Sequence, residues 1–206
     1  MEIALKNIGK SYRKQHLYEN LNAKFEGPGT YAILGENASG KSTLLRIICG
    51  LEKPSEGSLE WNHEGETIDS ADYYKELSIA SPYLDLFEEL SLKEHIEAFK
   101  KFKALQGNPS PEEFADLIEL KSSLNKPLKN FSSGMKQRLK VGLALYAEVA
   151  LVLLDEPTTN LDKKGWLWYQ SILASQAQKR LILVFSNYQE HEYQSCLGTI
   201  ELNKFK

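Results

Sequence analysis

The stretch from Tyr31 to Ile48, YAILGENASGKSTLLRII, constrains this chain more than any other, because it contains the phosphate-loop pattern GxxxxGK[ST] between two apolar segments. The apolar residues before the loop predict a buried strand, and those after it predict a helix. Glycines let the backbone curl so that successive N–H groups converge on phosphate oxygens, and the helix N-terminus adds free N–H groups. The stretch therefore predicts a nucleotide-binding loop.

Two side chains of this loop have separate expected roles. Lys41 is expected to reach the β- and γ-phosphates and to act in catalysis, and Ser42 is expected to offer its hydroxyl to Mg²⁺. The alternative, a chance glycine turn, does not account for the strand and helix patterns on either side. The predicted nucleotide-binding residues of the loop are Gly35, Glu36, Asn37, Ala38, Ser39, Gly40, Lys41, Ser42 and Thr43.

An acidic pair, Asp155 and Glu156, follows the apolar run LVLL. This run and LILVF at 181–185 are unbroken, so they predict central parallel strands buried on both faces. A carboxylate at the end of such a strand, beside a phosphate loop, is suited to hold Mg²⁺, which makes Asp155 a predicted metal residue. Glu156 is then placed to polarise the attacking water. The alternative is a pair of acids that begins a turn at Pro157.

The remaining patterns predict an α/β fold: a P-loop NTPase core with a mostly parallel central sheet and an N-terminal antiparallel β layer. A capping box at Ser91 predicts one helix start. Ser110, followed by proline in the first turn, predicts a second. We interpret residues 1–206 as a single domain with an inserted helical subdomain at about residues 82–129. Other expected strands lie at 1–8, 21–25, 57–61, 77–80 and 198–202, and other expected helices at 133–146 and 163–176.

Composition and charge disfavour several classes of function. The net charge of −3 argues against a surface that coats nucleic acid, so no nucleic-acid partner is expected. Cys49 and Cys196 lie beside apolar residues, and the four histidines show no ligand spacing with them, so we expect free thiols and no zinc site. We expect neither a signal peptide nor a membrane span of about 18 apolar residues, so any membrane role would require a partner.

An aromatic residue near the N-terminus and a polar turn at residues 131–138 are two further candidate binding features. Tyr12, in KSYRK, fits equally a surface aromatic on a hairpin and a ring stacked on adenine. Residues 131–138, FSSGMKQR, form a polar turn at a predicted helix N-terminus, and such a turn can bind an anion. Taken alone, this turn would predict only a helix cap.

Together these motifs resemble those of the ATP-binding subunit of ATP-binding-cassette (ABC) transporters, and the resemblance runs nearly end to end. GENASGKST looks like the family's Walker A loop, LVLLDE looks like its Walker B strand with the catalytic glutamate, and FSSGMKQR is similar to its LSGGQ signature. Ser132 and Gly134 of the signature are kept and would face the γ-phosphate. Residues 160–162, NLD, resemble the D-loop, and Tyr12 falls where the family stacks an aromatic ring on adenine.

The resemblance implies cofactors, partners and an activity. The cofactors would be ATP and Mg²⁺. A second ATP-binding subunit, like or unlike, would form a head-to-tail dimer that holds each nucleotide between one subunit's phosphate loop and the other's signature turn. ATP hydrolysis to ADP and phosphate would drive transport by a separate transmembrane permease. The subunit would then be cytoplasmic, peripheral on the inner face of the cell membrane.

In the signature, Phe131, Ser133 and Met135 replace the family's usual leucine, glycine and glutamine. Three further positions depart from the family's pattern. Ser81 stands where the family has a glutamine that contacts Mg²⁺, and Asn187 stands where it has a histidine at the γ-phosphate. Asparagine can hydrogen-bond a phosphate but cannot carry charge, and His191 is not expected to reach. Ala38 replaces a common glycine. These changes concern the rate of hydrolysis more than ATP binding. A weakly active or inactive regulatory module that dimerises with ATP therefore remains an alternative, and a soluble cassette ATPase of repair or translation is a third.

The helical segment is also expected to carry the contact with the membrane partner. Residues 81–90, SPYLDLFEEL, are expected to expose Tyr83, Leu86 and Phe87 as anchors. The alternative is that these side chains pack the subdomain itself. Phe102 is expected on the apolar face of the helix that starts at Ser91.

Overall fold

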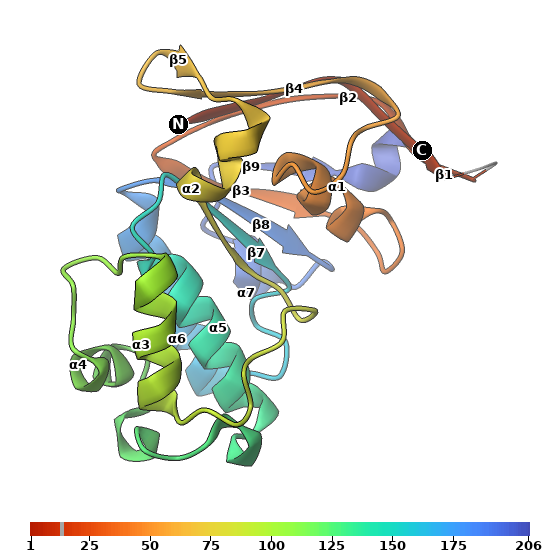
Figure 1. Ribbon diagram of the computed structural model, residues 1–206. Coiled ribbons are helices and arrows are strands. Elements are labelled where there is room, and N and C mark those ends of the chain that lie inside the picture. The colour runs from red at the N-terminus through yellow and green to blue at the C-terminus, as the bar shows by residue number, and fades with distance from the viewer. Residues whose placement is uncertain (13–14) are drawn as a thin grey trace.

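The central layer is a five-stranded sheet with the order β6-β7-β8-β3-β9, and all of its strand pairs are parallel (Figure 1). The computed structural model describes residues 1–12 and 15–206. Every residue of β7 and β8 is buried, as their unbroken apolar runs predict. The strands are β3 (Gly29–Leu34), β6 (Leu77–Ala80), β7 (Leu151–Asp155), β8 (Leu181–Ser186) and β9 (Gly198–Glu201).

The N-terminal strands form a separate antiparallel sheet with the order β2-β1-β4-β5, which confirms the predicted β layer. Helix α1 (Lys41–Ile48) lies between this sheet and the central one (Figure 1). Ile3, Leu21 and Trp61 are fully buried in the core that these layers share. The strands are β1 (Glu2–Tyr12), β2 (Gln15–Glu26), β4 (Glu56–His63) and β5 (Glu66–Thr67).

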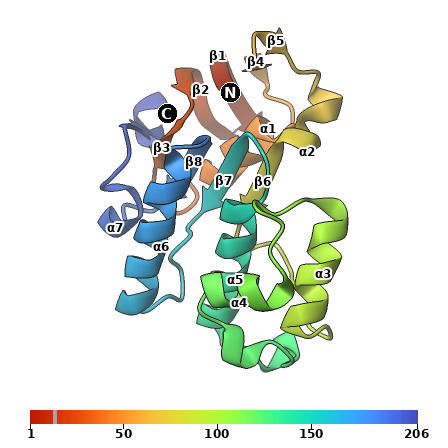
Figure 2. The same cartoon turned by 90° about the vertical axis from the view of Figure 1, so that its left-hand side faces the viewer.

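Helices α3 and α4 lie at the end of the molecule away from the antiparallel sheet (Figure 2). Both begin where they were predicted to begin, and each has a capping box, formed by Ser91 with Glu94 and by Ser110 with Glu113. They share a second hydrophobic core with α5 and α6, and the bounds 82–129 of the subdomain remain a prediction. The helices besides α1 are α2 (Tyr73–Glu76), α3 (Leu92–Phe102), α4 (Pro111–Leu117), α5 (Ser133–Tyr146), α6 (Lys163–Ala177) and α7 (Glu190–Tyr193).

Two apolar side chains lie differently from the sequence-based expectation. Phe102 is 88% exposed, because α3 ends at this residue and no further turn covers the ring. Leu86 is not exposed but partly buried against the helical core, whereas Tyr83 and Phe87 are exposed as predicted. Within residues 1–12 and 15–206, no helix combines the length and the apolar character needed to cross a membrane.

Candidate nucleotide-binding and catalytic site

The phosphate loop joins β3 to α1 and closes around the side chain of Lys41. Lys41 Nζ donates hydrogen bonds to the carbonyl oxygens of Gly35 at 2.8 Å and Glu36 at 3.1 Å. Gly40 has a φ of +99°, and a Cβ on Gly35 would lie 2.3 Å from Ser39 Oγ, so glycine is required at both positions. The loop therefore has a curled backbone whose N–H groups can surround a phosphate.

Ala38 is the loop residue that departs from the family's usual glycine. Its φ is +63°, in the left-handed region of backbone space. This conformation costs an L-residue roughly 1–2 kcal/mol, because the Cβ crowds the following carbonyl oxygen. The alanine therefore keeps the shape of the loop at a cost in stability.

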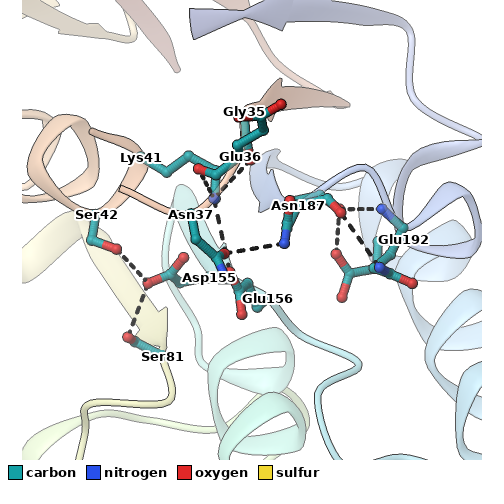
Figure 3. Close-up of polar contacts among 12 residues, drawn as sticks. Gly35, Glu36, Asn37, Lys41, Ser42, Ser81, Asp155, Glu156, Asn187 and Glu192 are labelled. Atoms are coloured by element: carbon teal, nitrogen blue, oxygen red, sulfur yellow. Dashed lines mark hydrogen bonds and ion pairs between the residues drawn. The ribbon is translucent and has the colours of Figure 1, made fainter. Parts of the chain in front are cut away.

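Asp155 lies at the end of β7, and two serine hydroxyls converge on its carboxylate (Figure 3). Ser42 Oγ donates to Asp155 Oδ2 at 3.3 Å, and Ser81 Oγ donates to the same oxygen at 3.2 Å. Burial raises the pKa of the Asp155 carboxyl, and the two hydroxyls partly offset that rise. The structure thus brings together all three residues predicted to act at a metal, and their hard oxygens are the ligand type that Mg²⁺ prefers.

Glu156 follows directly and faces the phosphate loop. Its Oε1 lies 3.8 Å from Lys41 Nζ, and a third of its side chain is exposed. The loop after β8 approaches from the other side, where Asn187 Nδ2 donates to Asn37 Oδ1 at 3.1 Å (Figure 3). His191 is directed elsewhere: its Nε2 lies 2.8 Å from Thr158 Oγ1. Two residues predicted to be catalytic, Glu156 and Asn187, thus both contact the phosphate loop.

A cavity of ≈ 610 Å³ opens over the phosphate loop. This volume falls within the range of roughly 300–1,000 Å³ that is usual for ligand sites. Two residues besides the predicted site residues line the cavity: Leu17, which carries no motif that could have identified it from the sequence, and Tyr83, which was predicted only as an anchor for the membrane partner. The predicted residues that line it are Tyr12, Asn37, Ala38, Gly40, Lys41, Ser42, Thr43 and Glu156.

Tyr12, at the edge of this cavity, is held by Glu52, which belongs to none of the sequence motifs. Its hydroxyl donates a hydrogen bond to Glu52, and this bond is the main reason that the pKa of Tyr12 is raised. Lys10 Nζ lies 2.7 Å from the same carboxylate. The ring remains 46% exposed, so it presents a free face at the end of β1. The ring is therefore accessible for stacking on adenine, as the second of the two interpretations of Tyr12 requires.

The signature turn lies at the start of α5 and opens on a different cavity. Ser132 caps the helix by accepting a hydrogen bond from Met135 N at 3.2 Å. A Cβ on Gly134 would lie 2.8 Å from Asn160 O, so the turn packs tightly against the segment predicted as the D-loop. The cavity here, of ≈ 340 Å³, shares no lining residue with the one over the phosphate loop. Within one chain, Ser132 and Gly134 therefore do not line the predicted nucleotide cavity.

The phosphate loop lies between the parallel strand β3 and helix α1, and the acidic pair follows β7, two places along the sheet. This arrangement defines a P-loop nucleoside triphosphatase. The model of the ABC transporter family matches residues 18–159. The chain belongs to the ABC transporter family, and it has the ATP-binding subunit's motifs and fold.

Relatives and solved structures agree with this family. The chain is 29% identical over 98% of its length, and over 92% of the relative, to the uncharacterized ABC transporter ATP-binding protein YybJ of Bacillus subtilis. It is 30% identical over 90% of its length to the lantibiotic transport ATP-binding protein SrtF of Streptococcus pyogenes, of which it covers 80%. A dimeric post-hydrolysis state of the ATP-binding cassette MJ0796, bound to ADP and Pi, shares the fold with a TM-score of 0.80. That likeness has 24% identity and covers 97% and 93% of the two chains.

Proposed function

We propose that this subunit binds ATP with Mg²⁺ between two head-to-tail copies and hydrolyses it to drive a separate membrane permease. The observation that carries this proposal is the convergence of Ser42 and Ser81 on Asp155, with Glu156 on the neighbouring side of Lys41. These oxygens could serve as ligands of Mg²⁺, and Glu156 could serve as the base, beside one phosphate loop. A carboxylate in that position can orient and polarise the attacking water.

The metal would be held by Ser42 and Asp155, with Ser81 beside them. Asp155 is 3% exposed and Ser81 is 7% exposed, so both oxygens are directed inward rather than to bulk solvent. Bound there, Mg²⁺ would supply charge neutralisation at the phosphates. Lys41 would exchange its hydrogen bonds to the loop carbonyls for phosphate oxygens, and Asn187 would donate an uncharged hydrogen bond on the γ-phosphate side.

A head-to-tail dimer would complete the site from two molecules. The signature turn and the phosphate loop of one chain open on separate cavities, so one chain alone does not surround a nucleotide. In the dimer, Ser132 and Gly134 of one copy would meet the γ-phosphate held by the other copy. The N-terminus of α5 would then direct free N–H groups and a positive dipole end at that phosphate.

The permease would dock on the side that carries the helical segment, and the chain would associate with the membrane through it. An apolar groove of ≈ 460 Å³ lies there between α3 and the edge strand β6. Leu51, Tyr74 and Phe102 line it with exposures of 71%, 65% and 88%, which is unusual for such large apolar side chains. A covering partner would explain that exposure.

We further propose that hydrolysis is slow, because Ser81 and Asn187 replace a glutamine and a histidine of the family. A serine hydroxyl reaches less far than a glutamine amide, and the asparagine brings no charge. Binding would be spared, since the phosphate loop and Asp155 are complete.

Glu156→Gln tests the proposal as a whole. The variant should bind ATP, turn over more slowly than the unmodified chain and elute as an ATP-dependent dimer in size-exclusion chromatography with Mg-ATP. Glu64→Gln, on an exposed hairpin turn, is the matched control and should behave as the unmodified chain. Normal turnover by a Glu156→Gln protein that stays monomeric at saturating ATP would overturn the assignment.

A further inference from the structure

Glu192, on the short helix α7, is a buried carboxylate that none of the motifs includes. Only 2% of the residue is exposed. Within the described residues it forms no ion pair with a lysine, arginine or histidine. A carboxylate in such a place is costly unless hydrogen bonds stabilise it. The groups that surround Glu192 therefore indicate why it is there.

Three donors meet this carboxylate, two from the loop after β7 and one from the last residue of β8. Thr158 donates to Oε1 twice, through its backbone N–H at 3.0 Å and its hydroxyl at 2.6 Å. The Ser186 hydroxyl donates to Oε2. Both partners are buried themselves, with exposures of 4% and 0%. Glu192 therefore joins the loop after β7 to the end of β8.

The hydrogen positions in this network follow from simple counting. Each hydroxyl has one proton, and an ionised carboxylate can only accept. The Thr158 and Ser186 protons are therefore directed at Glu192. Thr158 Oγ1 then accepts from His191 Nε2 at 2.8 Å, and Ser186 Oγ accepts from the Gln189 N–H at 3.2 Å. A neutral amide in place of Glu192 could not accept from all three donors.

The two joined loops are the ones that carry Glu156 and Asn187. Thr158 lies two residues after Glu156, and Ser186 directly precedes Asn187. Backbone bonds connect the same loops nearby, since Glu156 N donates to Phe185 O at 2.9 Å and Gly35 N donates to Ser186 O at 3.2 Å. Glu192 is the side chain that adds a charged link to this junction.

A cavity lies beside the junction that the Glu192 hydrogen bonds form, and it suggests what these bonds do. A cavity of ≈ 240 Å³ separates the two loops, and its lining includes Glu156, Thr158, Asn187, His191 and Glu192. Packed side chains would hold neighbouring loops apart without help, but a cavity allows them to shift. Hydrogen bonds therefore help to fix the spacing of the two loops beside the cavity.

We propose that Glu192 is a positioning residue that fixes the spacing between Glu156 and Asn187 through Thr158 and Ser186. The inference rests on the roles that the proposed function gives to Glu156 and Asn187. It predicts that loss of the charge lowers the catalytic rate while ATP binding, which takes place at the phosphate loop, is unchanged.

The first test compares Glu192→Gln with Glu190→Gln in the full-length chain. Glu190 lies on the same helix and is exposed, so its substitution should change nothing. We expect Glu192→Gln to lower kcat on the order of tenfold, with KM for ATP within about twofold of the unmodified value. Unchanged kcat in Glu192→Gln, where Glu156→Gln does lose turnover, would overturn the inference and leave the proposed function intact.

Two variants at Thr158 separate positioning from simple destabilisation. Thr158→Ser keeps the hydroxyl and should retain kcat, whereas Thr158→Val removes it and should lower kcat as Glu192→Gln does. The double variant Thr158→Val with Glu192→Gln should be no slower than either single variant, because both break one network. Additive losses, or equal losses in Thr158→Ser and Thr158→Val, would overturn the inference.

A measurement that does not depend on turnover completes the test. Hydrogen exchange at the Thr158 amide should be on the order of tenfold faster in Glu192→Gln than in Glu190→Gln, because its acceptor is weakened. Equal exchange in the two variants would refute the link even if the protein had no measurable ATPase activity. If the unmodified protein had no measurable ATPase activity and Glu156→Gln changed nothing, that outcome would instead count against the proposed function.

Discussion

The side-chain amide of Asn187 donates a hydrogen bond to Asn37 Oδ1 at 3.1 Å, which ties the loop after β8 to the phosphate loop across 150 positions of sequence. The asparagine is thus already placed against the loop that would hold the γ-phosphate. Its amide is a neutral donor, weaker than a charged one. Asn187 therefore occupies the place of the family's histidine, but the hydrogen bond that it can donate is weaker.

Asn187→His should raise kcat at saturating ATP by about tenfold or more with little change in ATP affinity, because one donor to the transition state is typically worth about 2.7–4 kcal/mol. Steady-state ATPase assays check this, with Asn187→Ala as the control that removes the bond to Asn37 without adding a donor. An unmodified chain that already turns over at roughly 10 s⁻¹ would contradict the prediction, since Asn187 would then not limit the rate.

Lys41→Ala should abolish ATP binding or turnover, because Lys41 Nζ is the cation at the centre of the phosphate loop. Isothermal titration with ATP and an ATPase assay measure the two effects. Lys6→Ala is the control, since Lys6 lies on the exposed face of the antiparallel sheet, paired with Glu60. Wild-type affinity and rate in Lys41→Ala would remove the assignment of the loop.

Glu52→Gln should weaken ATP binding several-fold and leave kcat unchanged. Glu52 holds the Tyr12 hydroxyl and pairs with Lys10, so its loss frees the ring that would stack on adenine. A fluorescent ATP analogue measures the affinity. Glu56→Gln, at an exposed position of β4, is the control. If Glu52→Gln binds ATP as the control does, Tyr12 is only a surface aromatic on the hairpin.

Ala38→Gly should stabilise the protein by roughly 0.5–1 kcal/mol, because glycine adopts the φ of +63° without the Cβ clash but loses more entropy on folding. For a chain of this size that is a rise in Tm of roughly 1–4 °C. Ala38→Val should shift Tm in the opposite direction, since a β-branched side chain is more strained there. A lower Tm for the glycine variant would show that Ala38 is not strained.

Phe102→Ser should weaken binding to the permease and leave Tm nearly unchanged, because the ring is 88% exposed in the apolar groove. Leu86→Ser should instead lower Tm, since Leu86 packs against the helical core. Leu197→Ser, at an exposed apolar position outside the groove lining, is the control. Co-purification with the permease and thermal unfolding separate these outcomes. If Phe102→Ser binds the permease as well as the unmodified chain does, the groove is not the docking site.

Local patterns in the sequence specify much of the fold. The buried strands that end at Asp155 and Ser186 could be predicted from their unbroken apolar runs. The helix starts at Ser91 and Ser110 could be predicted from a capping box and from a first-turn proline, because these signals are local. The burial of Leu86 and the exposure of Phe102 depend on which elements pack nearby, and one helical or loop segment does not reveal its neighbours.

Some residues of the site could likewise be predicted from the sequence, and others could not. The phosphate loop and the acidic pair are contiguous motifs, and the structure brings Lys41, Ser42, Asp155 and Glu156 together. Glu52 and Glu192 act through partners distant in sequence, and an isolated glutamate carries no signal that distinguishes it from a solvated surface residue. Both became visible only from their hydrogen bonds.

The separate openings of the phosphate loop and the signature turn have a genetic consequence. In the proposed dimer of like chains, each of the two sites takes its halves from different molecules. A population with a defective Lys41 and another with a defective Gly134 would each be inactive alone. When the two are co-expressed, mixed pairs would contain one site with both defects and one site with neither. Two loss-of-function alleles of this gene should therefore complement each other in the same cell.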